Sequence, residues 1–250
     1  MRFRIGEISF VNYIPFAAAD DAYPLEGEFF RAPPSELNAA CRRRELDVSA
    51  VSFFAYRDME DEYAMLPGFC IASDGPVDSV RLFSNYAPGD LKGRRIFFTT
   101  QSESSLGAFR AICRARHSFD PADCACPEIS GADAALLIGD AALSFDSPFR
   151  FDFDLGALWK EAFSVPLTYA AIVVRRSIYA AVAPAVSAHL GLSLGRFEAR
   201  RGFYCSLAAR RMASAKFSQA DADRYFSRLI YRVSDAAFRK SSDILHGKTH

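Results

Sequence analysis

The sequence predicts an α/β fold built on a parallel sheet. Short apolar runs of strand length alternate with amphipathic helical segments over residues 2–176, and this alternation is typical of strands joined by crossover helices. From residue 177 onward the apolar residues recur only at helical spacing. With 250 residues the chain is long enough for one large domain or two smaller lobes, with an ample core.

The expected elements follow one another in a regular order. We expect strands over residues 2–9, 28–32, 48–54, 63–69, 71–73, 78–84, 96–98, 134–139 and 167–174. We expect helices at 13–19, from 33 to about 46, after 105, from 155 to 159 and throughout the last third.

Two segments are candidate crossovers between lobes. Residues 85–92 are polar and contain the turn signal Pro88-Gly89, and the apolar run 167–174 is stopped by two arginines. These positions divide the chain into a first lobe of residues 1–87 with 173–250 and a second lobe of residues 88–172. We expect a ligand cleft between the two lobes.

The composition excludes several classes of function. Thirty Lys and Arg residues balance thirty Asp and Glu residues, so no net field attracts nucleic acid or an anionic membrane. The N-terminus lacks an apolar signal segment, and no run approaches the roughly 20 apolar residues of a membrane span. We therefore expect a cytoplasmic protein with no membrane or nucleic-acid partner. Its six cysteines should be reduced thiols.

The sequence contains no motif typical of a metal site or of a redox site. Cys124 and Cys126 are the only close cysteine pair, and their spacing fits neither a redox motif nor a zinc knuckle. The four histidines stand in polar or terminal settings. We expect no metal and no cofactor.

The stretch from Gly93 to Cys113 is the most informative part of the chain. An apolar run at 96–98 is followed by a turn rich in hydroxyl groups and then by an amphipathic helix. Such a helix N-terminus offers unpaired backbone N–H groups to a carboxylate or phosphate. The hydroxyl groups are those of Thr100, Ser102, Ser104 and Ser105. An alternative is local: Thr100 caps the helix and Glu103 closes a capping box.

Three other strand ends also carry polar or small residues. These are Ser9 with Asn12, Ser49 with Ser52, and Gly139 with Asp140. Because open α/β sheets bind ligands at the carboxyl ends of their strands, we expect these groups to converge. A site of neutral donors suits a small dicarboxylate. Alternatively, Asn12 and Asp140 cap the helices that follow them.

Seven segments of the chain resemble one known enzyme family. They cover most of residues 2–176 in order: 4–15, 35–38, 45–52, 73–80, 100–105, 136–143 and 154–159. The family comprises the menaquinone biosynthesis enzymes of the futalosine route. The opening Phe-Val-Asn-Tyr-Ile-Pro at residues 10–15 looks most like the chorismate dehydratases of that family.

The resemblance implies a two-lobed fold like the type II periplasmic binding proteins, with two crossovers between lobes. It also implies a hydro-lyase that converts chorismate, a small dicarboxylate, into 3-[(1-carboxyvinyl)oxy]benzoate. Asn12 and Ser79 match active-site positions of the family, and an amide such as Asn12 would orient the substrate rather than act as a base. Asp140 would bond a substrate hydroxyl.

Three other interpretations stay open at this point. The chain resembles, less closely, the naphthoate-forming lyase of the same pathway, whose functional histidine has no counterpart here. A non-catalytic protein that binds a small anion is a second alternative, although an export signal would be expected for a transport receptor. A degenerate ligand-sensing domain is the third.

Overall fold

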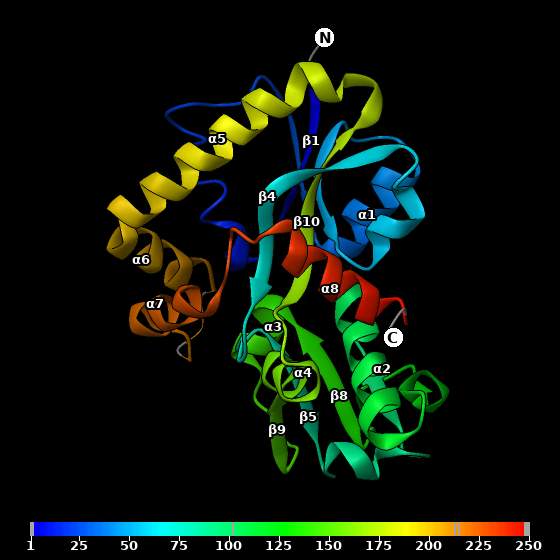
Figure 1. Cartoon of the computed structure of the whole chain (residues 1–250). Coiled ribbons are helices and arrows are strands. Elements are labelled where there is room, and N and C mark those ends of the chain that lie inside the picture. Colours follow the sequence, from blue (N-terminus) through cyan, green and yellow to red (C-terminus); the bar gives the residue numbers. More distant parts are fainter. Residues whose placement is uncertain (1–2, 102, 213, 215, 248–250) are drawn as a thin grey trace.

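Two five-stranded sheets, one in each lobe, form the framework of the computed structural model, which describes residues 3–101, 103–212, 214 and 216–247. Figure 1 shows one sheet above the other. The first has the order β2-β1-β3-β10-β4 and the second the order β7-β6-β8-β5-β9. The first sheet consists of β1 (Phe3–Ile8), β2 (Gly27–Ala32), β3 (Val48–Ser52), β4 (Tyr63–Ser73) and β10 (Leu167–Arg175). The second consists of β5 (Val80–Ser84), β6 (Ile96–Phe98), β7 (Ala125–Cys126), β8 (Ala134–Ile138) and β9 (Phe151–Asp154).

Helices cover both sheets and make up the C-terminal third. The α-helices are α1 (Pro34–Arg42), α2 (Glu103–His117), α3 (Gly139–Ser144), α4 (Leu155–Phe163), α5 (Tyr179–Ala199), α6 (Arg201–Met212), α7 (Gln219–Arg228) and α8 (Asp235–Leu245). Short 3₁₀ helices are η1 (Val11–Tyr13), η2 (Ala55–Met59), η3 (Pro88–Leu91), η4 (Pro121–Cys124) and η5 (Arg176–Ile178). In Figure 1, α2, α3 and α4 belong to the lower lobe and α1 to the upper lobe.

The sheets are mixed, which corrects the expectation of a purely parallel sheet. Strands β1, β2 and β3 are parallel, but β10 runs antiparallel to both β3 and β4. In the second sheet β6, β7 and β8 are parallel, and β5 runs antiparallel to β8 and β9. Strands β5 and β10 each enter their sheet from the other lobe. They therefore start where the neighbouring parallel strands end.

Both crossovers lie earlier in the chain than expected. Strand β5 pairs within the second sheet, so the chain changes lobe between Ser73 and Val80, before residues 85–92. All of β10 pairs within the first sheet, so the chain returns before Leu167. The boundaries at 87/88 and 172/173 are therefore wrong. The turn signal Pro88-Gly89 instead forms η3 inside the second lobe. The boundaries were misplaced because an apolar run in the sequence does not reveal which sheet it will join.

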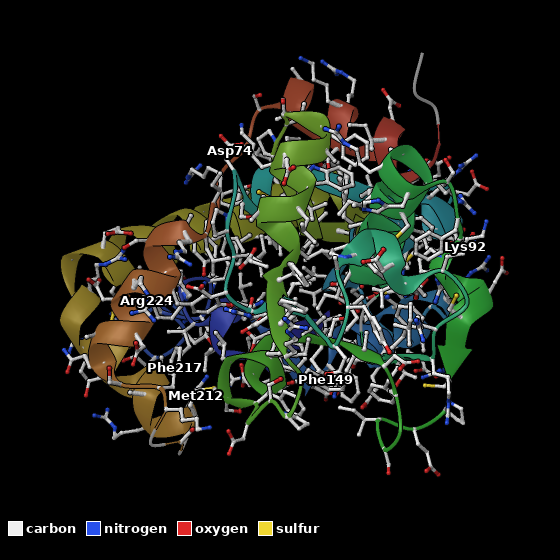
Figure 2. All side chains as sticks on the ribbon, turned by 90° about the horizontal axis from the view of Figure 1, so that it is seen from below. Asp74, Lys92, Phe149, Met212, Phe217 and Arg224 are labelled. Atoms are coloured by element: carbon white, nitrogen blue, oxygen red, sulfur yellow. The ribbon has the colours of Figure 1, made fainter. Side chains whose placement is uncertain are left out.

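The C-terminal third is anchored to the first sheet by an extended segment after α7. Ile230 exchanges two backbone hydrogen bonds with Ala72 of β4, and Cys70 N donates to Tyr231 O at 3.2 Å. This segment brings α7 against the second lobe, where Phe217 and Tyr225 face Phe83 and Leu143 across a hollow of about 170 Å³. In Figure 2 the helices that carry Met212 and Arg224 lie along one side of the molecule.

One helix is long and apolar enough to cross a membrane by length and composition, over residues Arg176–Ala199. Buried core helices satisfy the same two criteria, and 33% of this window is buried here. Val182, Val186 and Leu190 form the buried face of α5. Figure 1 shows α5 along the outside of the first lobe. The absence of a membrane partner stays a prediction.

The cysteines form no disulfide, as expected for reduced thiols. All six are free, and Cys41, Cys70, Cys113 and Cys205 are buried. Burial raises the pKa of Cys41 to about 11 and that of Cys70 to about 12. These buried thiols are therefore protonated at neutral pH and pack as small apolar side chains.

Candidate functional site

A small cavity lies between the two sheets, where the strand ends of both lobes meet. It encloses about 40 Å³ of space, which is close to the room that one or two water molecules need. Its lining comes from both lobes: Ile8, Phe10, Asn12, Pro34, Ser52, Ile71, Val77, Ser79, Val80, Ser105, Ile138, Gly139, Tyr169, Ala170 and Leu229. Wider hollows of about 440 Å³ flank α8, but they contain none of the predicted site residues.

Asn12 lies in η1, directly after β1. The N-cap of this 3₁₀ helix is Phe10, so Asn12 is not the helix cap that the local interpretation required. Its backbone carbonyl accepts a hydrogen bond of 2.8 Å from the Tyr231 hydroxyl. Its side-chain Oδ1 is buried and has no hydrogen-bond partner among the described residues. Since buried polar atoms are nearly always paired, this oxygen is available to a ligand in the cavity.

Ser52, at the end of β3, is the second polar group without a partner. Its Oγ atom is buried and unbonded within the described part of the chain. Its backbone N–H donates to Oδ1 of the buried Asn38 at 2.9 Å. Asn38 lies in one of the segments that carry the family resemblance, but the local sequence gave no sign that its side chain would bind the backbone of Ser52.

Ser79 and Gly139 meet across the second sheet. The Gly139 N–H donates to the Ser79 carbonyl at 2.7 Å, and the Ser79 hydroxyl accepts a hydrogen bond of 2.9 Å from Tyr225. Gly139 has a φ of 59°, and a Cβ there would stand 2.6 Å from the Phe10 ring. Only glycine therefore allows the first lobe to approach this turn so closely.

Among the described hydroxyl groups of the turn before α2 and of its first turn, that of Ser105 lines the cavity. Ser104 Oγ instead accepts a hydrogen bond of 3.0 Å from the Phe54 N–H of the first lobe, and Thr100 is exposed. Ser102 lies outside the described residues. The predicted cluster at this helix start therefore contributes one cavity-lining hydroxyl and one that joins the lobes.

Glu103 also joins the lobes instead of closing a capping box. Its carboxylate accepts hydrogen bonds from Asn38 at 2.9 Å and from Arg42 at 2.7 Å and 2.8 Å. Burial raises the pKa of Glu103, but the hydrogen bonds from Arg42 and Asn38 outweigh it and leave that pKa below its ordinary value. The Ser35 N–H donates to Gln101 O beside this pair. The lobes are thus held closed on the α1 side.

Three other predicted residues lie outside the cavity wall. Ser9 is exposed, and Ser49 Oγ donates to the carbonyl of Ala50 on its own strand. Asp140 accepts a hydrogen bond of 3.0 Å from Val11 N, so it holds η1 in place from the second lobe. Burial raises the pKa of Asp140 above its ordinary value, although the Val11 N–H opposes the shift.

The cavity wall carries polar groups but no charged side chain among the described residues. Asn12, Ser52, Ser79, Ser105 and Tyr169 supply its polar groups, and apolar side chains supply the rest. Among the described residues, no group of three or more His, Cys, Asp or Glu side chains gathers in metal-binding geometry. Neutral hydroxyl and amide groups can hold the carboxylates of a ligand without burying an opposite fixed charge.

Comparison with known proteins identifies the family of this chain. The model of the family described as menaquinone biosynthesis matches residues 3–241. The chain belongs to this family. Among curated proteins, the chorismate dehydratase of Thermus thermophilus is 30% identical over 173 residues, which are 61% of this chain and 63% of that protein. The match thus spans less than two thirds of this relative's length.

Solved structures place the chain in the periplasmic-binding-protein-like fold, as the resemblance implied. An Archaeoglobus fulgidus protein superimposes with a TM-score of 0.75 at 19% identity, covering 99% of this chain and 97% of its own. The alkanesulfonate-binding protein of Xanthomonas axonopodis pv. citri gives 0.70 at 14% identity, covering 99% and 93%. The aliphatic sulphonate-binding protein of Escherichia coli gives 0.63 at 12% identity, covering 99% and 87%. At these identities the likeness concerns the fold alone.

Proposed function

We propose that this protein is a cytoplasmic chorismate dehydratase, which removes water from chorismate to give 3-[(1-carboxyvinyl)oxy]benzoate in the futalosine route to menaquinone. One observation carries the proposal: two buried polar atoms that bind no other described residue, Asn12 Oδ1 and Ser52 Oγ, belong to side chains lining the same interlobe cavity in a chain of the menaquinone biosynthesis family. The similarity to a chorismate dehydratase supports the choice of substrate.

The reaction asks for positioning more than for strong acids or bases. The ring C3–H bond of chorismate breaks first, because the resulting charge spreads to the ring carboxylate. The C4–O bond then breaks, the ring becomes aromatic, and the proton leaves with the hydroxyl as water. The enolpyruvyl carboxylate of the substrate itself takes the proton from C3. A neutral, water-excluding site that holds the substrate in a reactive geometry fits this course.

The lining residues divide this work. Asn12 orients the reacting ring through its amide, since an amide is too weakly basic to remove a proton. Ser79, Ser52 and Ser105 donate hydrogen bonds to the substrate carboxylates. Asp140 holds the Asn12 turn against the second lobe through Val11. No cofactor enters the scheme.

The lobes must separate for the substrate to enter. The cavity of about 40 Å³ is far smaller than the several hundred Å³ typical of small-molecule sites. The contacts of Ser104 with Phe54 and of Glu103 with Arg42 join the lobes in the closed arrangement. Opening breaks these contacts, and closure around the substrate excludes water.

The decisive experiment mixes the purified protein with chorismate, follows its loss by ultraviolet absorbance and identifies the product by mass. The proposal expects an aromatic product lighter than chorismate by one water. Binding of chorismate without turnover, seen as a raised melting temperature, would instead favour a small-anion binding protein, the class to which the alkanesulfonate-binding neighbour belongs. If chorismate neither reacts nor raises the melting temperature, the naphthoate-forming step becomes the next activity to test.

A further inference from the structure

Tyr225 of α7 reaches the site from the C-terminal third of the chain. Ser218 opens α7 with a capping box to Asp221, and Ala222, Tyr225 and Phe226 form its buried face. Tyr225 is only 1% exposed and Ser79 only 3%. The Tyr225 hydroxyl donates to Ser79 Oγ at 2.9 Å. A residue far from β5 in the sequence therefore controls a hydroxyl at the start of that strand.

This hydrogen bond determines which way Ser79 can act. A serine hydroxyl has one hydrogen to donate and lone pairs to accept. Because one lone pair of Ser79 takes the Tyr225 hydrogen, the serine's own hydrogen stays available to an acceptor in the cavity. Ser79 is thereby presented as a donor, the role that an anionic oxygen requires.

Tyr225 itself stands behind the site. It lines the hollow of about 170 Å³ on the opposite side, with Asp221 and Arg224, and is not part of the cavity wall. Burial raises its pKa well above the ordinary tyrosine value. The hydroxyl therefore keeps its hydrogen throughout the neutral range.

We propose that Tyr225 is a positioning residue that makes Ser79 a hydrogen-bond donor toward the substrate. The role rests on the proposed dehydratase function. In chorismate the complementary group for Ser79 is a carboxylate oxygen.

The test compares Tyr225→Phe with a matched control, Tyr204→Phe. Tyr204 is also buried in the C-terminal third, and its hydroxyl donates to Ala18 O at 2.6 Å, away from the cavity. Each variant removes one buried hydroxyl and leaves one acceptor unpaired, so similar drops in the unfolding midpoint are expected. For chorismate we expect kcat to fall about 10- to 100-fold in Tyr225→Phe, the range of one lost positioning contact, with a smaller change in KM. In Tyr204→Phe we expect both constants to stay within about twofold.

A double variant separates positioning from a general weakening of the fold. In the Ser79→Ala background, the loss of kcat caused by Tyr225→Phe should shrink to below about fivefold, because the two residues act through one bond. This background removes both ends of the buried bond and so remains informative where Tyr225→Phe alone is too unstable. Equal kcat in the two tyrosine variants, or an undiminished effect in the Ser79→Ala background, would overturn the positioning role alone. Failure of the unsubstituted protein to dehydrate chorismate would overturn the dehydratase and this role together.

Discussion

Two pairs of nearby serines show how similar hydroxyl groups serve different purposes in this molecule. Ser52 lines the cavity without a partner, while Ser49 on the same strand bonds the carbonyl of Ala50. Ser105 lines the cavity, while its neighbour Ser104 binds Phe54 N in the other lobe. A step of three residues along a strand, or of one residue along a helix, turns the side chain to a different direction. The hydroxyls of Ser49 and Ser104 stabilise the protein, whereas the hydroxyl of Ser52, which no described residue binds, is available for chemistry.

Replacing the cavity amide should have the largest effect. We expect Asn12→Ala to lower kcat for chorismate at least about 100-fold, in line with the loss of a preorganised polar group at a reacting centre. The unfolding midpoint should change little, because Asn12 Oδ1 bonds nothing in the described structure. Asn85→Ala is the control, since Asn85 is exposed and its side chain accepts only from Arg150 N among the described residues. Near-normal turnover in Asn12→Ala would contradict the proposed role of Asn12 in orienting the substrate.

The comparison within β3 is sharpened by substituting each serine in turn. Ser52→Ala should lower kcat/KM about 10-fold through a lost hydrogen bond to the substrate, with little effect on stability. Ser49→Ala should leave kcat/KM within about twofold, because Ser49 lies outside the cavity wall. Steady-state kinetics and thermal unfolding of both variants provide the measurement. Equal kinetic losses would show that side-chain direction does not separate the two hydroxyls.

Ser104→Ala should affect stability rather than chemistry. The substitution leaves the Phe54 N–H without its partner, and an unpaired buried donor costs about 1–3 kcal/mol. Chemical unfolding should therefore show a lower free energy of unfolding, with kcat for chorismate within about threefold of the unsubstituted protein. A kcat loss as large as that of Asn12→Ala would mean that Ser104 belongs to the reacting site after all.

His189 extends the comparison to a titratable side chain whose ring nitrogens bind groups of the protein itself, away from the cavity. Its Nδ1 bonds Tyr23 O at 2.8 Å and its Nε2 bonds Asp20 at 3.2 Å. Both partners can accept hydrogens, so these bonds stabilise the imidazolium ion relative to the neutral ring. Burial lowers the pKa of His189, but the bonds to Asp20 and Tyr23, with a smaller contribution from Glu7, outweigh it and raise that pKa above 6.5. Arg31 pairs with Glu7 and Asp20 in the same cluster.

The sign of the pH effect follows from that direction. Because its pKa is raised in the folded state, protonated His189 makes its full contribution to stability below the ordinary histidine pKa of about 6.5. This contribution is lost as the pH rises through the folded-state pKa. We expect His189→Gln to lower the free energy of unfolding by about 1 kcal/mol below that pH and to flatten the decline above it. Denaturant unfolding across this pH range tests both effects. If the free energy of unfolding of His189→Gln declines with pH as it does in the unsubstituted protein, another titrating group causes the decline.

The resemblance and the polar strand ends together named part of the cavity wall, and local pattern was a poorer guide to the boundaries between the lobes. Asn12, Ser79, Ser52, Ser105 and Gly139 were all predicted and all line the cavity. Ser49, Ser104, Ser9, Thr100 and Asp140 were predicted with them and do not line it. Tyr225 was not predicted as a site residue, since nothing in the local sequence connects α7 with Ser79.

By itself the sequence determined the local elements, the absence of net charge and the family, because periodicity, composition and motifs are properties of short segments. The order and direction of strands, the positions of the crossovers and the identity of the groups facing the cavity were decided only by the tertiary structure. Strands β5 and β10 look like any other apolar run, and their sheets depend on contacts with distant strands. The bond between Tyr225 and Ser79 joins residues 146 positions apart, a separation that no local pattern encodes.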